Sequence, residues 1–578
     1  MSTAQETQQF GLSSNLVNYG DPEFALFLRK AFIKGAGYSD DALQKRIIGI
    51  INTGSGYNPC HGNINDLIEA AKRGVQSSGA LLVEFPTISL HESFCQPTSM
   101  YLRNLMSIDT EEQLKAQPMD ACILVGGCDK TVPAQLMGAI SADVPVVQLV
   151  TGSMLTGSFR GERIGACTDC RRYWAMYRGE EIDVEDISLA NDNLVSSVGT
   201  CGVMGTASTM ACIAVALGMM PISGASPPAV SSARMRVAEV TGRLAVEIAK
   251  AKRTPSQILS FESFENAVAV LQAIGGSTNA IVHLLAIAGR SNVDFSLDTF
   301  HRIGRHVPVL VDLKPSGEHY MEDFHRAGGI GTLLRIMKPL LHLNARTVTG
   351  RTLGEEIDQA PKSFPQTVIR SLQDPIYPSC GLTILRGNLA PYGAALKQSA
   401  ASASLLQHSG RAVVFENLED LALRIDDEQL KVTPESVLVL KNIGPKGACM
   451  PEAGYIPIPK KLLRMGVKDM VRISDGRMSG TAAGTVVLHI SPESAIGGPL
   501  WVVRNGDVIR LDAPNGRLEL DISPIEMRNR LAEFQEPLWN ERGFMGLHKR
   551  CVLQADQGAD FDFLLHKSKR VTAGNRVR

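Results

Sequence analysis

The sequence has no excess of either charge, no long hydrophobic run and few aromatic residues. Its 58 basic and 59 acidic residues leave a net charge of −1, and neither sign forms a long run. This balance argues against nucleic acid or an anionic membrane as the main partner. The apolar stretches at 206–220 and 280–288 are too short or too polar to span a bilayer.

The amino-terminal residues 1–10 also lack the apolar core of a secretory signal. We therefore expect a cytoplasmic protein whose eleven cysteines stay reduced and serve in burial, metal binding or catalysis. Aromatics make up only 5%, whereas glycine occurs 53 times, which fits many tight turns and close backbone approaches. A chain of 578 residues is too long for one core and predicts two or three domains.

The first part of the chain alternates apolar runs with helical patterns. A mostly helical leading segment is expected over residues 1–40, with its helix at 22–34. The runs 47–51, 80–85, 121–125 and 144–149 predict buried parallel strands. Long helices are expected at 235–252 and 265–285, a strand at 307–311 and another helix opening at 324–329. Within the second long helix, residues 275–279 read Gly-Gly-Ser-Thr-Asn, which suggests a helix start that faces a ligand.

The pattern changes after about residue 354. Residues 358–379 are rich in proline, serine and charge, and predict a linker. Beyond them, strands are expected at 382–386, 412–416, 436–440, 470–473, 485–490, 500–503, 508–511 and 518–522. Asn-Gly pairs at 505–506 and 515–516 are typical of hairpins. The prediction is an α/β protein: a parallel-sheet domain over 1–365 and a β-barrel-like domain with flanking helices over 380–578.

Three cysteines share one local pattern. Cys60, Cys128 and Cys201 each lie between a glycine-containing turn and the start of a helix. Helix N-termini favour the thiolate, the form that binds metal. Asp129 follows Cys128, and a soft sulfur beside a hard oxygen suggests two different metals that serve one substrate. Taken alone, the stretch around Cys128 is better explained by a buried cysteine with a surface Asp–Lys pair beside a turn.

Two loops of the second half carry chemically active side chains. Residues 442–447 lead to Glu452, a carboxylate beyond a strand and a glycine turn. Residues 474–481 place Asp475, Arg477 and Ser479 in one glycine-bounded loop. Glu452 alone is compatible with a solvated loop acid, and Asp475 and Arg477 with a turn stabilised by its own side chains.

Together and in this order, these segments resemble the dihydroxy-acid and sugar-acid dehydratase family over residues 47–564. The resemblance is closest to its pentonate and hexonate (arabinonate-type) branch and implies a two-domain subunit in a homodimer or homotetramer. The matching blocks are Pro59-Cys60, Gly127-Cys128-Asp129-Lys130, Thr200-Cys201, Met204 to Met210, Gly275 to Asn279, Arg386-Gly387-Asn388-Leu389, Gly444-Pro445 and Asp475 to Gly480.

The resemblance implies a hydro-lyase that turns a 2,3-dihydroxy sugar acid into a 2-keto-3-deoxy acid. The matching positions are Cys60, Cys128 and Cys201 for a 2Fe–2S cluster; Glu92, Asp129, Glu452 and a carbamylated Lys130 for Mg²⁺; and Ser479 for the base, with Thr481 as the weaker candidate. Three cysteines leave one iron short of a protein ligand, so it can act as a Lewis acid at the C3 hydroxyl. Mg²⁺ would stabilise the negative charge that develops on the carboxylate and C2 oxygen of the substrate. The serine must act as an alkoxide, because a neutral hydroxyl is a poor base.

The chain departs from its relatives at three places near these positions. His61 stands where asparagine is usual, Gly202-Val203 where Asn-Thr is common, and Thr151-Gly152-Ser153 where Gly-Gly-Pro is usual. None is a ligand or the base, so the implied reaction stands and the preferred sugar acid stays open. Two other readings also stay open: a dehydratase of branched-chain dihydroxy acids, whose alkyl tail would need an apolar pocket, and a non-enzymatic iron–sulfur or zinc protein, which would need no base.

The remaining cysteines are given no catalytic role. Cys167 and Cys170 have C-x-x-C spacing, but no second pair or histidine pair completes a zinc site. We interpret this spacing as incidental, with both thiols reduced or near the pocket. The others are interpreted as small core residues: Cys95, Cys122, Cys212, Cys380, Cys449 and Cys551.

Overall fold

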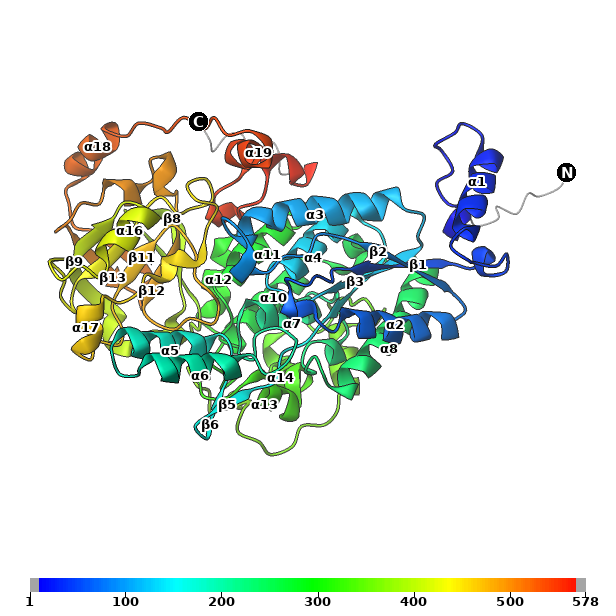
Figure 1. The fold of residues 1–578 in the computed structure, drawn as a ribbon, viewed down its shortest axis with the longest axis horizontal. Coiled ribbons are helices and arrows are strands. Elements are labelled where there is room, and N and C mark those ends of the chain that lie inside the picture. Colours follow the sequence, from blue (N-terminus) through cyan, green and yellow to red (C-terminus); the bar gives the residue numbers. More distant parts are fainter. Residues whose placement is uncertain (1–9, 568–578) are drawn as a thin grey trace.

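The structure is a computed structural model that describes residues 10–567; residues 1–9 of the leading segment and 568–578 of the expected second domain lie outside them. Its N-terminal domain contains a four-stranded parallel sheet in the order β2-β1-β3-β4 (Figure 1). The strands are β1 (Ile47–Asn52), β2 (Leu81–Pro86), β3 (Ala121–Gly126) and β4 (Val146–Val150). β1 and β3 are almost wholly buried, which their continuous apolar runs predict for inner strands covered on both faces. All four expected strands are present.

Helices cover both faces of this sheet. α3 packs against α4 on one face, and α2 packs against α8 on the other (Figure 1). The helices up to α15 are α1 (Pro22–Lys34), α2 (Ile64–Ser77), α3 (Ser99–Ala116), α4 (Thr131–Ala142), α5 (Thr168–Arg178), α6 (Val184–Leu194), α7 (Thr206–Ala216), α8 (Ser232–Ala251), α9 (Pro255–Ile258), α10 (Phe261–Ala273), α11 (Asn279–Arg290), α12 (Leu297–Gly304), α13 (Met321–Arg326), α14 (Gly329–Ile336) and α15 (Leu353–Gln359).

Two expectations for this domain were wrong. The single helix over 265–285 is two helices, α10 and α11, because the chain turns at Gly275, whose φ of +53° interrupts the helical hydrogen bonds. The strand at 307–311 is replaced by isolated bridges of Val309 with Tyr377 and of Val311 with Ile369. These apolar residues are buried by packing against helices and not by joining a sheet.

The C-terminal domain is a closed eight-stranded barrel in the order β10-β11-β12-β8-β7-β14-β13-β9. Its strands are β7 (Thr383–Gly387), β8 (Ala390–Leu396), β9 (Gln407–Phe415), β10 (Val437–Leu440), β11 (Arg472–Ser474), β12 (Val486–Ser491), β13 (Val508–Asp512) and β14 (Arg517–Leu520). Its helices are α16 (Leu418–Arg424), α17 (Lys460–Arg464), α18 (Pro524–Ala532) and α19 (Gly543–Cys551). The predicted fold class, an α/β domain followed by a barrel with helices, is confirmed.

Sequence patterns misplaced two barrel elements. The expected strand at 500–503 is a short 3₁₀ helix, Pro499–Val502, with proline at its first position where no backbone donor is needed. The sequence did not predict β8, because Pro391 and Gly393 are unusual in a strand. Pairing with β7 and β12 stabilises it as a strand. Asn515-Gly516 does join β13 to β14, whereas Asn505-Gly506 precedes β13 without linking two strands.

One segment of the N-terminal domain, residues 157–194, extends to the barrel. Strands β5 (Gly157–Phe159) and β6 (Glu162–Ile164) form a small antiparallel pair, followed by α5 and α6. α5 contacts α17 of the C-terminal domain (Figure 1). Cys167 immediately precedes α5, and Cys170 lies in the first turn of this helix.

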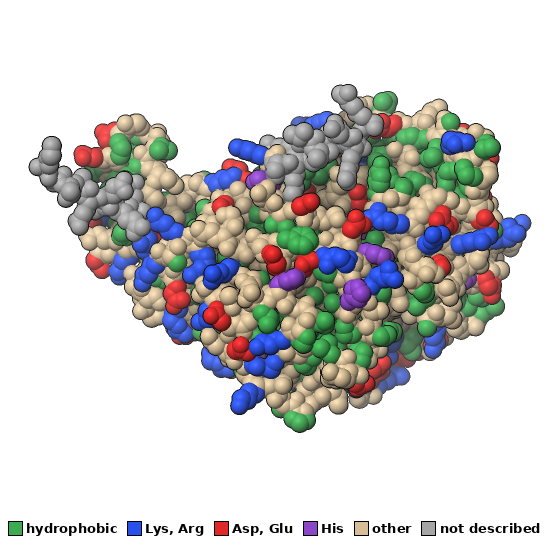
Figure 2. Space-filling view, turned by 180° about the vertical axis from the view of Figure 1, so that it is seen from behind, with side chains coloured by type: hydrophobic (Ala, Val, Ile, Leu, Met, Phe, Trp, Pro, Cys, Tyr) green, Lys and Arg blue, Asp and Glu red, His purple; other side chains and the backbone are tan. Residues whose placement is uncertain are grey.

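At the opposite end of the molecule α1 stands away from the main body (Figure 1). It exposes Phe24, Phe27 and Phe32, which are 45%, 65% and 80% exposed. On the face seen in Figure 2, basic and acidic side chains are intermixed, in line with the small net charge. Within residues 10–567, no helix is both long enough and apolar enough to cross a membrane.

Candidate functional site

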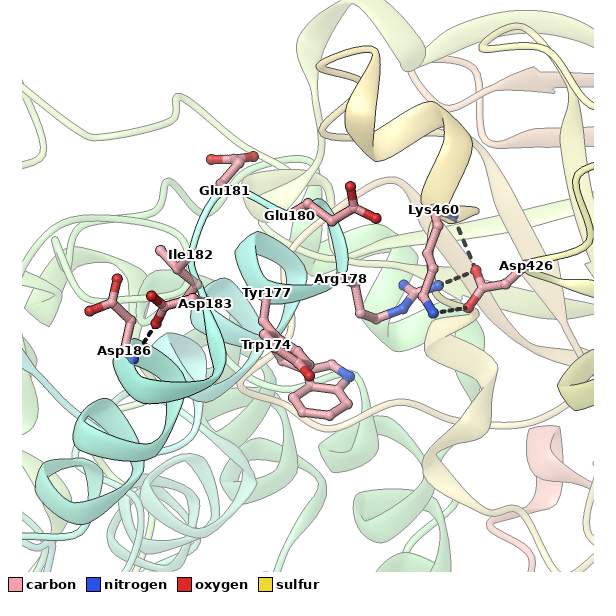
Figure 3. A pocket seen from close by; sticks show the side chains of 10 residues that line it. All are labelled: Trp174, Tyr177, Arg178, Glu180, Glu181, Ile182, Asp183, Asp186, Asp426 and Lys460. Carbon is pink, nitrogen blue, oxygen red and sulfur yellow. Dashed lines mark hydrogen bonds and ion pairs between the residues drawn. The ribbon is translucent and has the colours of Figure 1, made fainter.

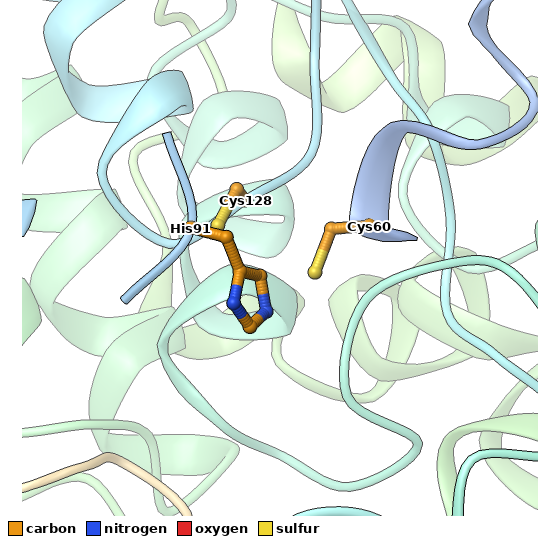
Figure 4. A group of neighbouring side chains, drawn as sticks. All are labelled: Cys60, His91 and Cys128. Atoms are coloured by element: carbon orange, nitrogen blue, oxygen red, sulfur yellow. The ribbon is translucent and has the colours of Figure 1, made fainter. Parts of the chain in front are cut away.

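The three predicted cysteines come together, and two further side chains join them. The Sγ atoms of Cys60 and Cys128 and a ring nitrogen of His91 all lie within 4.8 Å of one another (Figure 4). Cys201 interacts electrostatically with Cys60, and its Sγ lies 3.5 Å from Cys167 Sγ. Five separate segments therefore converge on this group of thiols, and the structure places Cys167 beside Cys201.

His61 builds the turn beneath these thiols. Its Nε2 accepts hydrogen bonds from the backbone N–H groups of Gly127 and Cys128, both at 2.9 Å. Its Nδ1 therefore carries the proton and donates to the carbonyl oxygen of Thr53 at 2.8 Å. Burial lowers the pKa of His61 to about 4, so the ring is neutral. The departure from asparagine at position 61 thus serves the backbone around Cys128.

The other departures also support this turn. A Cβ at Gly127 would lie 1.7 Å from the hydroxyl oxygen of Thr151, so only glycine fits there. Ser153 forms a parallel bridge with Thr200, directly before Cys201. The N–H of Gly202 donates to the carbonyl oxygen of Ala166 at 3.0 Å. These positions therefore shape the backbone that carries the cysteines.

Hydrogen bonding among the thiols favours ionisation of Cys60. A hydrogen bond from Cys128, with a second from His91, lowers the pKa of Cys60 to about 6 despite its burial. His91 accepts the N–H of Ser93 at Nδ1, which leaves Nε2 to donate to the sulfur. A thiolate is consequently available here near neutral pH, as metal binding requires.

The predicted hard-metal ligands lie beside the thiols, and a buried arginine links two of them. Arg477, only 1% exposed, contacts Glu92 Oε2 through Nη2 and Glu452 Oε1 through Nη1, both at 2.8 Å. Lys130, also 1% exposed, pairs with the neighbouring Asp129. Our sequence reasoning placed Arg477 in a glycine-bounded loop but missed this bridge, which joins segments from both domains.

The two glutamates differ in their electrostatics. Burial opposes ionisation of Glu92, but Arg477 and Lys130 together hold its pKa well below the usual range. Burial raises the pKa of Glu452, and Arg477 only partly offsets this effect. Glu452 and Lys130 also interact, so all four predicted hard ligands share one electrostatic neighbourhood. Carboxylates gathered this closely are stabilised by a cation, which Arg477 supplies in part.

The loop that carries Ser479 is inserted against the N-terminal domain. The hydroxyl oxygens of Ser479 and Thr481 are 2.8 Å apart. A Cβ at Gly480 would lie 2.8 Å from the N–H nitrogen of Thr206, so glycine permits a close approach to the start of α7. That start follows Cys201 by only a few residues, so the loop lies next to the thiols.

Three side chains hold this loop in place. Asn279 donates to the carbonyl oxygen of Met478 at 2.8 Å, and Thr168 donates to that of Thr481 at 2.9 Å. The Gly-Gly-Ser-Thr-Asn turn, expected to face a ligand, thus contacts the Ser479 loop. Asp475 is fully buried and accepts the N–H groups of Ile443 and Ser494, which ties the loop to its own domain. Asp475 is therefore structural.

A separate hollow lies at the far end of α5. It has a volume of about 930 Å³, and no predicted site residue lines it. Arg178 and the backbone N–H of Lys460 converge there on Asp426, at 2.6 and 3.1 Å (Figure 3). This contact fastens the end of α5 to the barrel. The hollow is lined by Trp174, Tyr177, Arg178, Glu180, Glu181, Ile182, Asp183, Asp186, Asp426 and Lys460.

The other cysteines follow their expected role only in part. Cys122, Cys212 and Cys449 are buried, as predicted for small core residues. Cys95, Cys380 and Cys551 are only half-buried, so the core interpretation is wrong for them. They lie on turns or at a helix end, where the apolar context of the sequence does not reveal solvent access.

Comparison with known proteins identifies the family of this chain. Residues 45–356 match the family model described as dihydroxy-acid/6-phosphogluconate dehydratase N-terminal, and residues 367–559 match its C-terminal counterpart. L-arabinonate dehydratase of Rhizobium leguminosarum is 47% identical over 94% of this chain and 95% of its own. The 6-deoxy-6-sulfo-D-gluconate dehydratase of Pseudomonas putida is 43% identical over 91% of both chains. Dihydroxy-acid dehydratase of Sulfurisphaera tokodaii is 35% identical over 94% and 98%. The chain therefore belongs to the dihydroxy-acid/6-phosphogluconate dehydratase family and is a dehydratase, a hydro-lyase.

Proposed function

We propose that this dehydratase removes water from a sugar acid, a 2,3-dihydroxy carboxylate, to form a 2-keto-3-deoxy acid. The observation that carries the proposal is the insertion of the Ser479 loop beside Cys201, a thiol that shares its neighbourhood with the predicted oxygen ligands of Mg²⁺. A Cβ at Gly205 would lie 2.8 Å from the methyl carbon of Thr481 and 3.9 Å from Cβ of Cys201, and Asp129 interacts electrostatically with Cys60. Relatives named for L-arabinonate and sulfogluconate share 47% and 43% identity with this chain, against 35% for one named for dihydroxy acids.

The wall of the site supports a hydroxylated substrate over an alkyl one. Arg171 lies 3.7 Å from Glu452 Oε2 and stacks on the ring of Tyr455, 4.8 Å from its centroid. The Nε atom of Arg171 is buried and has no hydrogen-bond partner among the described residues. The guanidinium therefore places a charged, polar group beside Glu452, which suits a hydroxylated tail better than an alkyl one.

The donor atoms fit the cofactors that the resemblance implies. Cys60, Cys128 and Cys201 would hold a 2Fe–2S cluster, since clustered thiols with one depressed pKa suit iron. The oxygen ligands for Mg²⁺ would be Glu92, Asp129, Glu452 and a carbamylated Lys130. When bound, the cluster would polarise the C3 hydroxyl and Mg²⁺ would balance charge on the carboxylate and C2 oxygen.

Ser479 would remove the C2 proton as an alkoxide. Its hydroxyl lies 2.8 Å from that of Thr481, which would orient the oxygen and share its proton. Thr481 is the weaker candidate for the base, because its β-branched side chain has less rotational freedom. A non-enzymatic metal protein would need neither this loop nor the oxygen ligands beside the thiols.

Three wider expectations are also proposals. We propose domain boundaries at 1–365 and 380–578, a cytoplasmic location, and a homodimer or homotetramer. The assembly is supported by the phenylalanines exposed on α1, since contiguous exposed apolar surface is typical of an interface.

A substrate panel with matched variants tests the function. Anaerobically purified enzyme should release 2-keto acid from aldonic acids such as L-arabinonate, and much less from a branched-chain dihydroxy acid. Cys60→Ser, Cys128→Ser and Cys201→Ser should lose iron, sulfide and activity. The buried Cys212, whose thiol pKa is raised by burial alone and not by the other thiols, offers a control: Cys212→Ala should keep all three. Full activity in a colourless, iron-free protein would contradict the proposal.

A further inference from the structure

The family match gives Cys167 no role, yet its thiol lies in the site. Its Sγ is 3.5 Å from Cys201 Sγ, and the thiols of Cys60 and Cys128 are hydrogen-bonded to each other. The four sulfurs thus form two close pairs. Two sulfurs bound at about 2.3 Å to one tetrahedral metal lie about 3.8 Å apart. The spacing of Cys167 and Cys201 therefore suits two ligands of one metal.

The position of Cys167 is built by contacts on both sides of it. Before it, the carbonyl oxygen of Ala166 accepts the N–H of Gly202 at 3.0 Å, which sets the chain beside Cys201. After it, the carboxylate of Asp169, 1% exposed, accepts the N–H of Gly165 at 2.9 Å. The same carboxylate also accepts the hydroxyl of Tyr320 at 2.8 Å. A thiol anchored in this way is more than a chance neighbour.

The helix that Cys167 begins also connects to the Ser479 loop. Thr168, the next residue, donates to the carbonyl oxygen of Thr481 at 2.9 Å. At the other end of α5, Arg178 Nη1 donates to the carbonyl oxygen of Ile458 at 2.9 Å. α5 is thus held to the C-terminal domain at both ends. Cys167 therefore begins a helix whose first residue is hydrogen-bonded to the Ser479 loop.

We propose that Cys167 is a fourth thiolate ligand of the cluster in the substrate-free enzyme, paired with Cys201, and that it gives up this place when the sugar acid binds. The inference rests on the proposed function, because it requires the cluster. One metal–sulfur bond would break, and its electron pair would stay on Cys167 as a thiolate. The C3 hydroxyl of the sugar acid, with its proton, would take the vacated position, and no electron would be transferred. Four thiolates would close the cluster to small molecules until substrate arrives.

The test compares anaerobic holoenzymes by electron paramagnetic resonance after reduction, by iron and sulfide content, and by alkylation. Cys167→Ser and Cys167→Ala should keep iron and sulfide but shift the g-values of the reduced cluster. Cys170→Ser is the matched control on the same helix. The Cys170 thiol contacts Cys167, and a serine hydroxyl can preserve that hydrogen bond, so its spectrum should equal that of the wild type.

Wild-type protein offers a second readout. Iodoacetamide should alkylate Cys167 in the cluster-free protein at least about tenfold faster than in the holoenzyme, and L-arabinonate should abolish the protection. An unchanged spectrum in Cys167→Ser, equal alkylation in both forms, or a Cys167–Cys170 disulfide in the anaerobic holoenzyme would overturn this inference alone. Wild-type protein that binds no iron or sulfide would overturn the proposed function with it.

Discussion

Replacing Ser479 by alanine removes a hydroxyl whose only side-chain partner among the described residues is Thr481. The structural cost should therefore be that of one hydrogen bond, about 1 kcal/mol. The loop would stay in place, because Asn279 and Thr168 hold it through the backbone carbonyl oxygens of Met478 and Thr481. If Ser479 is the base, the rate should fall by roughly 10²–10⁴-fold, which corresponds to about 3–5 kcal/mol of barrier.

The assay separates these effects. Ser479→Ala should keep the visible spectrum, the metal content and near-normal substrate affinity, and lose turnover together with any exchange of the C2 hydrogen with solvent. Ser474 provides a matched control in the same loop, since within residues 10–567 its hydroxyl has one hydrogen bond, from the N–H of Gly476. Ser474→Ala should lose little activity. Turnover in Ser479→Ala above about a tenth of the wild-type value would show that another group is the base.

Three further predictions concern the metal side and the supporting turn. EDTA should abolish activity without bleaching the cluster, and Lys130→Arg should be inactive because a guanidinium cannot form the carbamate; an active variant would refute that role. Arg477→Met should be less stable by about 3–5 kcal/mol, because Glu92 and Glu452 lose their buried partner. Mg²⁺ should raise the melting temperature of this variant more than that of the wild type. An equal rise in both proteins would contradict this prediction. The pKa of His61 is depressed on folding from 6.5 to about 4, so its contribution is complete above pH 6.5 and is lost as pH falls through about 4. Acidification of metal-free protein should therefore cost up to about 3 kcal/mol through His61 and speed amide exchange at Gly127 and Cys128, corrected for intrinsic rates, whereas His61→Asn should lose that much less stability over the same pH range and show no acid-induced rise in exchange at these two residues.

The local sequence was sufficient for the parts whose signal is local. The continuous apolar runs of β1 and β3 predicted inner parallel strands, because a strand buried on both faces needs no polar alternation. Cys60, Cys128 and Cys201 could be singled out because each lies between a glycine turn and a helix start. The approach of Cys60 to Cys128 could be expected, since each follows a parallel strand that ends at the same edge of the sheet, whereas Cys201 follows no strand of that sheet.

The tertiary structure decided what depends on contacts between distant segments. Cys167 reaches Cys201 through the backbone bond from Gly202 to Ala166, which no pattern around the C-x-x-C motif reveals. Arg477 bridges Glu92 and Glu452 only because the barrel packs against the first domain. Apolar periodicity reports that a residue is buried, but the neighbours that bury it decide which element it joins.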